Sequence, residues 1–202
     1  MLASPFLFGT FTSAGLLVAI GAQNAYVLKQ GLMKHKVFLT ALFCSLADAL
    51  LITMGVGGLG SLITASTLLL WIAKWGGFAF LIWYGSKSFR ACFRNQSMKI
   101  DTGILEKPGT KEVLLTLAAF TFLNPQVYLD TLVLVGSVGS QFESSERTLY
   151  AAGAILGSWV WFFSLAYGSR LLAPLFENPV AWRILDFLVG CVMWAIAFSL
   201  LL

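Results

Sequence analysis

The stretch EVLLTLAAFTFLNPQVYLDTLVLVGSV, residues 112–138, decides the fold. It contains no basic residue and is long enough to cross a bilayer as a helix, which takes about 20 mostly apolar residues. A proline inside a helix removes a backbone donor and clashes with the carbonyl four residues earlier, so Asn124-Pro125 should break this helix. Backbone groups freed at membrane depth are tolerated only where protein or a water-lined cavity satisfies them. The stretch therefore predicts a broken transmembrane helix beside a polar cavity.

The composition of the whole chain also indicates a membrane protein. Of its 202 residues, 58% are hydrophobic and only 11% are charged, and the mean hydropathy is +0.85. A soluble domain would carry roughly 25% charged residues. The first apolar run has no basic n-region and no cleavage site, so it is expected to be a span and not a signal peptide. We predict an all-α integral membrane protein, a single transmembrane domain over residues 1–202, whose six helices lie at about 5–30, 37–60, 67–89, 112–138, 148–170 and 180–202.

The basic residues indicate topology and not nucleic-acid binding. Of the 13 Lys and Arg residues, all but Lys74 and Arg147 fall on the odd-numbered connections between the six spans or at their edges. Cytoplasmic loops of membrane proteins carry an excess of Lys and Arg. The odd connections are therefore expected in the cytoplasm and both termini on the outer side, with the lipid bilayer as a partner and no nucleic acid.

The chain divides into two similar halves of three spans each. A polar segment at about 91–111, expected in the cytoplasm, separates a first half (about 1–90) from a second half (about 112–202). Because three spans is an odd number, the halves must run antiparallel in the membrane, as in many transporters. We predict two inverted three-helix repeats, and laying one on the other at a common offset of 113 residues matches Ser45 with Ser158 and Gly77 with Gly190.

Two acidic residues lie deep in the expected spans. Asp48 sits in SLADALL of the second span, and Asp130 follows Asn124-Pro125 in the fourth. A charge at the bilayer centre costs roughly 2.5–3.5 kcal/mol on insertion scales, so each needs a reason. Each aspartate is either protonated or hydrogen-bonded to a neighbour such as Ser45 or Thr131 as a packing device, or it belongs to a site for a cation, a proton, or both in turn.

Other polar and aromatic side chains accompany the two aspartates. Gln23 and Asn24 interrupt the apolar first span, and Asn124 and Tyr128 share one helical face because they are four residues apart. Trp161, deep in the fifth span, either stacks on a cationic substrate or packs in the core. The two aspartates are also the candidates for proton coupling. The candidate substrate-binding residues are Gln23, Asn24, Asp48, Asn124, Tyr128, Asp130 and Trp161.

The sequence predicts neither a cofactor nor a metal site. Cys44, Cys92 and Cys191 show no CxxC spacing, and His35 lies in an expected loop, so too few ligands gather for a metal. No HExxH or GxSxG motif is present, which disfavours an enzyme. Glycines inside the spans permit close packing of helices, within one chain or between the subunits of a homo-oligomer.

Five segments together resemble the LysE family of amino-acid exporters, most closely its arginine exporter branch. The resemblance covers nearly the whole chain, in order. It implies a bacterial inner-membrane carrier that moves arginine, lysine and their analogues out of the cytoplasm. The segments are GAQNAYVLKQGL, SLADALL, WGGFAFLIWYG, FTFLNPQVYLDTLVLVGSVG and VGCVMWAIA.

One position departs from the family pattern. The family motif usually reads Gly-Pro-Gln-Asn, whereas this chain has Gly21-Ala22-Gln23-Asn24. Either the first span stays regular, or Gly21 alone permits a break that mirrors the one at Pro125.

Three functions therefore follow from the sequence, and the first is the prediction. It is an exporter of basic amino acids, L-arginine above all, coupled to inward proton movement. The second is an exporter of neutral amino acids or other small solutes, in which the aspartates carry only protons. The third is a structural membrane subunit that transports nothing.

Overall fold

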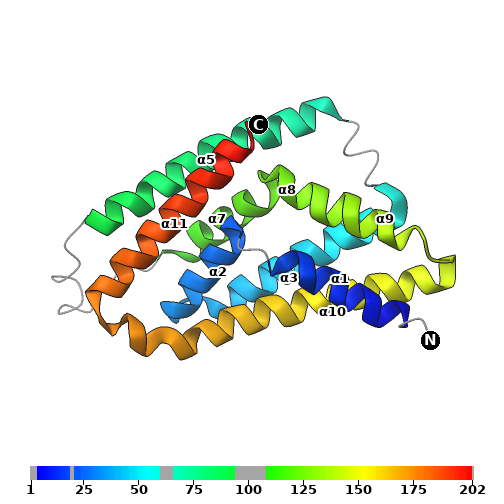
Figure 1. Cartoon of the computed structure of the whole chain (residues 1–202), viewed down its shortest axis with the longest axis horizontal. Helices are drawn as coiled ribbons and strands as arrows, with labels where there is room; N and C mark the ends of the chain where they lie inside the picture. The colour runs from blue at the N-terminus through cyan, green and yellow to red at the C-terminus, as the bar shows by residue number, and fades with distance from the viewer. Residues whose placement is uncertain (1–3, 19–20, 60–65, 94–107, 202) are drawn as a thin grey trace.

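The computed structural model describes residues 4–18, 21–59, 66–93 and 108–201, and every regular element in these ranges is a helix. Most of the predicted linker at about 91–111 lies outside the described residues. Figure 1 shows the helices as a bundle in which α5 and α11 run side by side along one flank and α10 along the opposite one. The helices are α1 (Pro5–Leu17), α2 (Ala22–Leu32), α3 (Val37–Met54), η1 (Gly55–Leu59), α5 (Thr67–Phe93), α7 (Thr110–Phe122), α8 (Pro125–Val127), η2 (Tyr128–Val135), α9 (Gly136–Gly139), α10 (Ser144–Gly168), η3 (Ser169–Glu177) and α11 (Pro179–Ser199).

Most of the expected membrane spans are present. Three stretches of described helix, Val37–Gly58, Ser144–Pro174 and Val180–Ser199, are long and apolar enough to cross a bilayer. Two bent pairs, α1 with α2 and α7 with α8–α9, bring the number to five if each pair is one span. The stretch expected as the third span forms α5, a helix of 27 residues. That helix is about 40 Å long at 1.5 Å per residue, but it is not among these candidates, so the six-span arrangement stays a prediction.

The fourth span is broken where the sequence predicts. Helix α7 ends at Phe122, and Asn124 has the extended backbone of an N-cap, with φ −103° and ψ 107°. Pro125 then opens α8, a position where its missing N–H costs nothing. The helical axes on the two sides of the break differ by 61°.

The first span is also broken, although it lacks the proline. Helix α1 ends at Leu17, and α2 begins at Ala22 after Gly21, whose backbone is extended (φ −97°, ψ 172°). The axes of α1 and α2 differ by 84°. Of the two alternatives left open by the sequence, the structure therefore has the broken helix.

Glycines allow three pairs of helices to approach closely. A methyl group at Gly153 would overlap the Phe6 carbonyl, so α1 and α10 are in backbone contact there. Gly55 and Gly136 bring η1 and α9 together in the same way, because a side chain at Gly136 would meet the Gly55 backbone. Gly85 accommodates the Trp194 ring between α5 and α11. Small residues at helix interfaces are how helices pack closely in lipid.

An aromatic cluster from three helices fills the core beside α2. The ring of Phe120 (α7) lies 5.5 Å from that of Tyr26 (α2) and 5.1 Å from that of Tyr84 (α5), between ring centroids. All three side chains are buried. Aromatic pairs at such distances stabilise a core beyond the area that they bury.

Several basic residues gather at one end of the bundle. His35, between α2 and α3, contacts the Pro108 carbonyl before α7 through Nε2, at 2.9 Å. Lys87 in α5 forms an ion pair with Glu112 in α7, with both side chains more than half exposed. The described parts of the first and third connections thus meet at the same end, which agrees with the charge pattern of the sequence. We call this end, at Lys34, His35 and Lys36, the basic end.

Candidate substrate site

Two adjoining pockets lie between the broken helices, and both predicted aspartates line them. The inner pocket has a volume of about 70 Å³ and is lined by Asp48 from α3 and by Asp130 and Thr131 from η2. The larger pocket, about 290 Å³, is lined by the residues of both helix breaks and by the last turn of α11. The pockets share Leu16, Leu17, Gln23, Val127 and Asp130. We treat them as one cavity.

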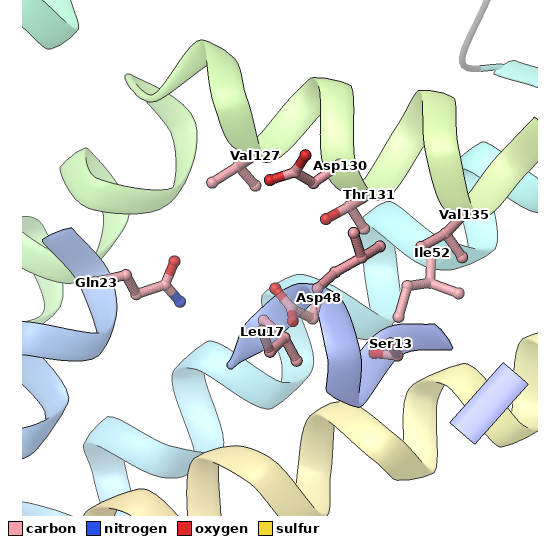
Figure 2. Close-up of a pocket in the computed structure, with 10 residues that line it drawn as sticks. Ser13, Leu17, Gln23, Asp48, Ile52, Val127, Asp130, Thr131 and Val135 are labelled. Atoms are coloured by element: carbon pink, nitrogen blue, oxygen red, sulfur yellow. The ribbon is translucent and has the colours of Figure 1, made fainter. Parts of the chain in front are cut away.

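Figure 2 shows how the polar groups of the inner pocket lie. Asp48 and Asp130 approach the same space from opposite helices, and Gln23 enters it from α2. Among the described residues that line the two pockets, none is Lys, Arg or His. The cavity therefore presents two carboxyl groups without a basic side chain of its own to pair with them.

Asp48 is held in place by a residue of the other half of the chain. Its side chain is 4% exposed, and Oδ2 accepts a hydrogen bond of 2.8 Å from the Ser158 hydroxyl in α10. Ser158 is fully buried. The expected local partner, Ser45, has no hydrogen-bond partner for its hydroxyl among the described residues.

Asp130 lies in the π-helical segment that follows the second break. Its Oδ1 accepts a hydrogen bond of 2.9 Å from Gln126 Nε2 one turn earlier, so its partner is Gln126 and not Thr131. The side chain is only half-buried. Widened π-helical turns occur often at functional sites, and this one places Asp130 and Thr131 on the cavity wall.

Gln23 contributes an amide group to the cavity. It lines both pockets, is 8% exposed, and its Nε2 has no hydrogen-bond partner among the described residues. A buried donor without a partner is costly, roughly 1–3 kcal/mol. A water molecule or a ligand in the cavity would remove this cost.

At each break, the last carbonyl of the helix before it accepts a hydrogen bond from a side chain that follows the break. Asn24 Nδ2 donates to the carbonyl of Leu17, the last residue of α1, at 2.7 Å. The Tyr128 hydroxyl donates to the carbonyl of Phe122, the last residue of α7, also at 2.7 Å. Helix ends at membrane depth need such partners. The two residues thus stabilise the breaks that shape the cavity.

Two predicted binding residues act from outside the cavity lining. The Trp161 indole donates to Asn24 Oδ1 at 3.3 Å, and Tyr128 bonds to Phe122; neither lines the two pockets. The structure thus places Trp161 beside Asn24 and outside the lining of the two pockets, a position that favours packing, one of the two alternatives left open by the sequence. Asn124 does line the larger pocket, and its side chain caps Gln126 N.

Replacing Tyr128 by Phe should destabilise the protein. The substitution keeps the ring but leaves the Phe122 carbonyl without its donor, and one such hydrogen bond contributes about 0.5–1.5 kcal/mol to stability. Thermal unfolding in detergent, followed by tryptophan fluorescence, should occur at a lower temperature than for the unaltered chain. Tyr167→Phe, at an exposed residue of α10, is the matched control, and an unchanged unfolding temperature for Tyr128→Phe would contradict the cap.

Sequence reasoning missed several residues of the site. Ser158 is the most informative, because a hydroxyl in the middle of the fifth span carried the same signal as Asn124 in the fourth. Ser13 and Ser199 also line the pockets, together with apolar side chains from several helices, among them α1, α3, α10 and α11. Nothing in the sequence distinguishes those apolar residues from ones that face lipid.

Comparison with known proteins places these observations in a family. The model of the family described as LysE type translocator matches residues 14–202. The chain is 40% identical over 195 residues to "Arginine exporter protein ArgO" of Pectobacterium carotovorum subsp. carotovorum (strain PC1), which covers 96% of this chain and 95% of the relative. Proteins with the same name from Serratia proteamaculans (strain 568) and Yersinia enterocolitica (serotype O:8 / biotype 1B) are 42% and 40% identical with the same coverage. No solved structure matches the chain.

Proposed function

Because the chain belongs to the LysE type translocator family, we propose that it exports basic amino acids, above all L-arginine with lysine and analogues such as canavanine, from the bacterial cytoplasm. Relatives about 40% identical over nearly their whole length are named arginine exporters. The single observation that carries the proposal is the cavity with Asp48 and Asp130 on its wall and no basic side chain among its described lining residues. A cationic guest would supply the missing charge.

The cavity has room and chemistry for such a guest. Its larger pocket, about 290 Å³, is close to the lower limit of small-molecule sites, roughly 300 Å³. A guanidinium group suits a carboxylate because its planar fork makes two parallel hydrogen bonds. In this proposal Asp48 or Asp130 binds the cationic side chain, and Gln23 and Asn124 contact the backbone groups of the amino acid.

The start of α2 is the proposed position of the substrate carboxylate. Gly21, Ala22 and Gln23 line the larger pocket, and no side chain among the described residues caps the α2 N-terminus. Half-helix N-termini carry partial positive charge and bind anionic groups in transporters. The second break differs, because the Asn124 side chain already occupies the start of α8. The proposed orientation therefore has the carboxylate at the first break and the cationic side chain towards the aspartates.

Export of a cation needs an energy source. Moving one positive charge outward against a negative-inside potential costs about 2.3 kcal/mol per 100 mV. Inward proton movement is the simplest source. We propose that Asp48 or Asp130 alternately holds a proton and the substrate.

The helix contacts support the inverted repeat as part of the proposal. The broken first span (α1 and α2) packs on the middle helix of the second half (α10), and the broken fourth span (α7, η2 and α9) packs on the middle helix of the first half (α3 and η1). The third helices, α5 and α11, pack on each other. Exchange of the two halves leaves this pattern unchanged, as a twofold axis in the membrane plane would. Both termini then lie on the outer side of the inner membrane.

A canavanine assay tests the export function. Bacteria that lack other arginine exporters should survive canavanine when they express this chain and should release preloaded radiolabelled arginine. Unlabelled canavanine inside the cells should compete with arginine for release, and threonine should not. Competition by threonine alone would favour the neutral amino-acid exporter, and no release of either would contradict export.

A further inference from the structure

A largely buried ion pair joins the two halves of the chain, from α2 to α11. Lys29 Nζ in α2 donates to Asp186 Oδ1 in α11 at 2.5 Å, across 157 residues of sequence. The Asp186 side chain is 1% exposed and that of Lys29 is 20% exposed. The Lys29 side chain is therefore the more accessible partner of the pair.

The pair lies between the cavity and the basic end. Along α2 the cavity residues are Ala22–Asn24, and Lys29 follows about one and a half turns later, at 3.6 residues per turn. Along α11 the cavity residues are Ile196, Ser199 and Leu200, and Asp186 lies nearly three turns before Ile196. The two helices thus lead from the cavity to the ion pair together, and α2 continues to the basic end.

Buried side chains separate the pair from the cavity. Tyr26 and Val27 occupy this interval on α2, and Val189 and Met193 occupy it on α11, each less than 5% exposed. Tyr26 belongs to the aromatic cluster with Tyr84 and Phe120. A substrate that reaches the cavity from the basic end must therefore displace this layer, and α2 and α11 must separate where the ion pair now joins them.

We propose that Asp186 is an inner binding position for the cationic side chain of the substrate, and that Lys29 occupies it as a tethered stand-in when no substrate is present. This inference rests on the proposed function, because it places a further specificity-determining residue on the route to the same cavity. An amino acid with a guanidinium or ammonium group can replace Lys29 at Asp186. A neutral amino acid cannot, because Asp186 would then remain as a buried charge without a partner, which is strongly unfavourable.

The proposal makes the pair a charge filter, and citrulline tests it. Citrulline has the shape of arginine with a neutral urea group in place of the guanidinium, so the ratio of arginine to citrulline export measures discrimination by charge. In the double variant Lys29→Gln, Asp186→Asn this ratio should fall about tenfold or more, the factor expected when a hydrogen bond to a charged group is lost. The control is the double variant Lys87→Gln, Glu112→Gln, in which the exposed ion pair between α5 and α7 loses both charges. It should leave the ratio unchanged.

A conservative variant gives a second measurement, which should not change if the ion pair has only a structural role. In Lys29→Arg the tethered group binds Asp186 through a planar fork and competes better with the substrate. The KM for arginine should rise several-fold, because the substrate must displace a stronger competitor from Asp186. An unchanged KM here, or an unchanged ratio in a neutralised variant that still exports arginine, would overturn the inference and leave arginine export intact. If the unaltered chain exports no arginine, the proposed function fails first.

Discussion

Replacing Asp48 by Asn should reduce arginine efflux more than about a hundredfold. In the proposed complex Asp48 forms a buried ion pair with the cationic substrate. Loss of one partner from such a pair costs roughly 3–5 kcal/mol, and each 1.4 kcal/mol is a factor of ten. Asn has the shape of Asp, and its Oδ1 can still accept from the Ser158 hydroxyl, so the fold should survive. The variant can neither pair with a guanidinium group nor carry a proton. Release of radiolabelled arginine from preloaded cells, at matched amounts of protein in the membrane, measures the effect.

Two further variants separate the charge of Asp48 from its position. Ser158→Ala keeps the carboxylate but removes its hydrogen bond, which contributes about 1.5–3 kcal/mol to a charged acceptor, so efflux should fall by less than in Asp48→Asn. Glu112→Gln changes an exposed carboxylate far from the cavity lining and should export normally. Efflux from Asp48→Asn equal to that of the unaltered chain would contradict a role for the aspartate in binding or coupling.

The sequence predicted the two helix breaks unequally, for a physical reason. Pro125 cannot continue a helix without losing a hydrogen bond, and the structure confirms a break there. Gly21 has an extended backbone with negative φ, which any residue can adopt, so the residue type alone carried no signal. What stabilises the first break is the contact of Asn24 with Leu17. That contact depends on the direction of α2 relative to α1, which the residue types at the break do not determine.

Contacts between distant parts of the chain could not be predicted from one sequence. The burial cost of Asp48 and Asp130 indicated that both need partners, and the structure brings both to one cavity. The identity of the partners did not follow, because Ser158 lies 110 residues from Asp48. Lys29 was assigned to the cytoplasmic edge of the first span because of its charge, and the structure places it in α2, opposite Asp186.

The two side-chain caps link the predicted polar residues to the shape of the cavity. Asn24 and Tyr128 looked like ligands because both are polar at membrane depth. In the structure each bonds to the last carbonyl of the helix before its break. The cost of burying these two polar side chains, which identified them in the sequence, is therefore offset at least in part by their hydrogen bonds to backbone carbonyls, and a bound substrate is not needed for all of it. Asp48, Asp130 and Gln23 remain the groups that turn towards the cavity (Figure 2).

Replacing Gly153 by Leu should remove most of the folded protein from the membrane. A Cβ at this position would overlap the Phe6 carbonyl of α1. The atoms that it meets belong to the backbone of α1, so they cannot move aside without a shift of the helix. Overpacking inside a well-packed core typically costs about 1–3 kcal/mol, and here α1 would have to separate from α10. Because α1 also carries Ser13, Leu16 and Leu17 to the cavity, any protein that remains should export poorly. The measurement is the monodisperse fraction on size-exclusion chromatography after detergent extraction.

Gly15→Leu is the matched control for this substitution. Gly15 lies on α1, the helix that Gly153 contacts, but a Cβ there meets no atom of the described residues within 4 Å, so the added side chain should be accommodated. The expected result is a normal yield for Gly15→Leu and a yield reduced at least several-fold for Gly153→Leu. Equal yields and equal arginine efflux from the two variants would show that α1 does not pack on α10 through this glycine, and the position of α1 at the cavity would lose its support.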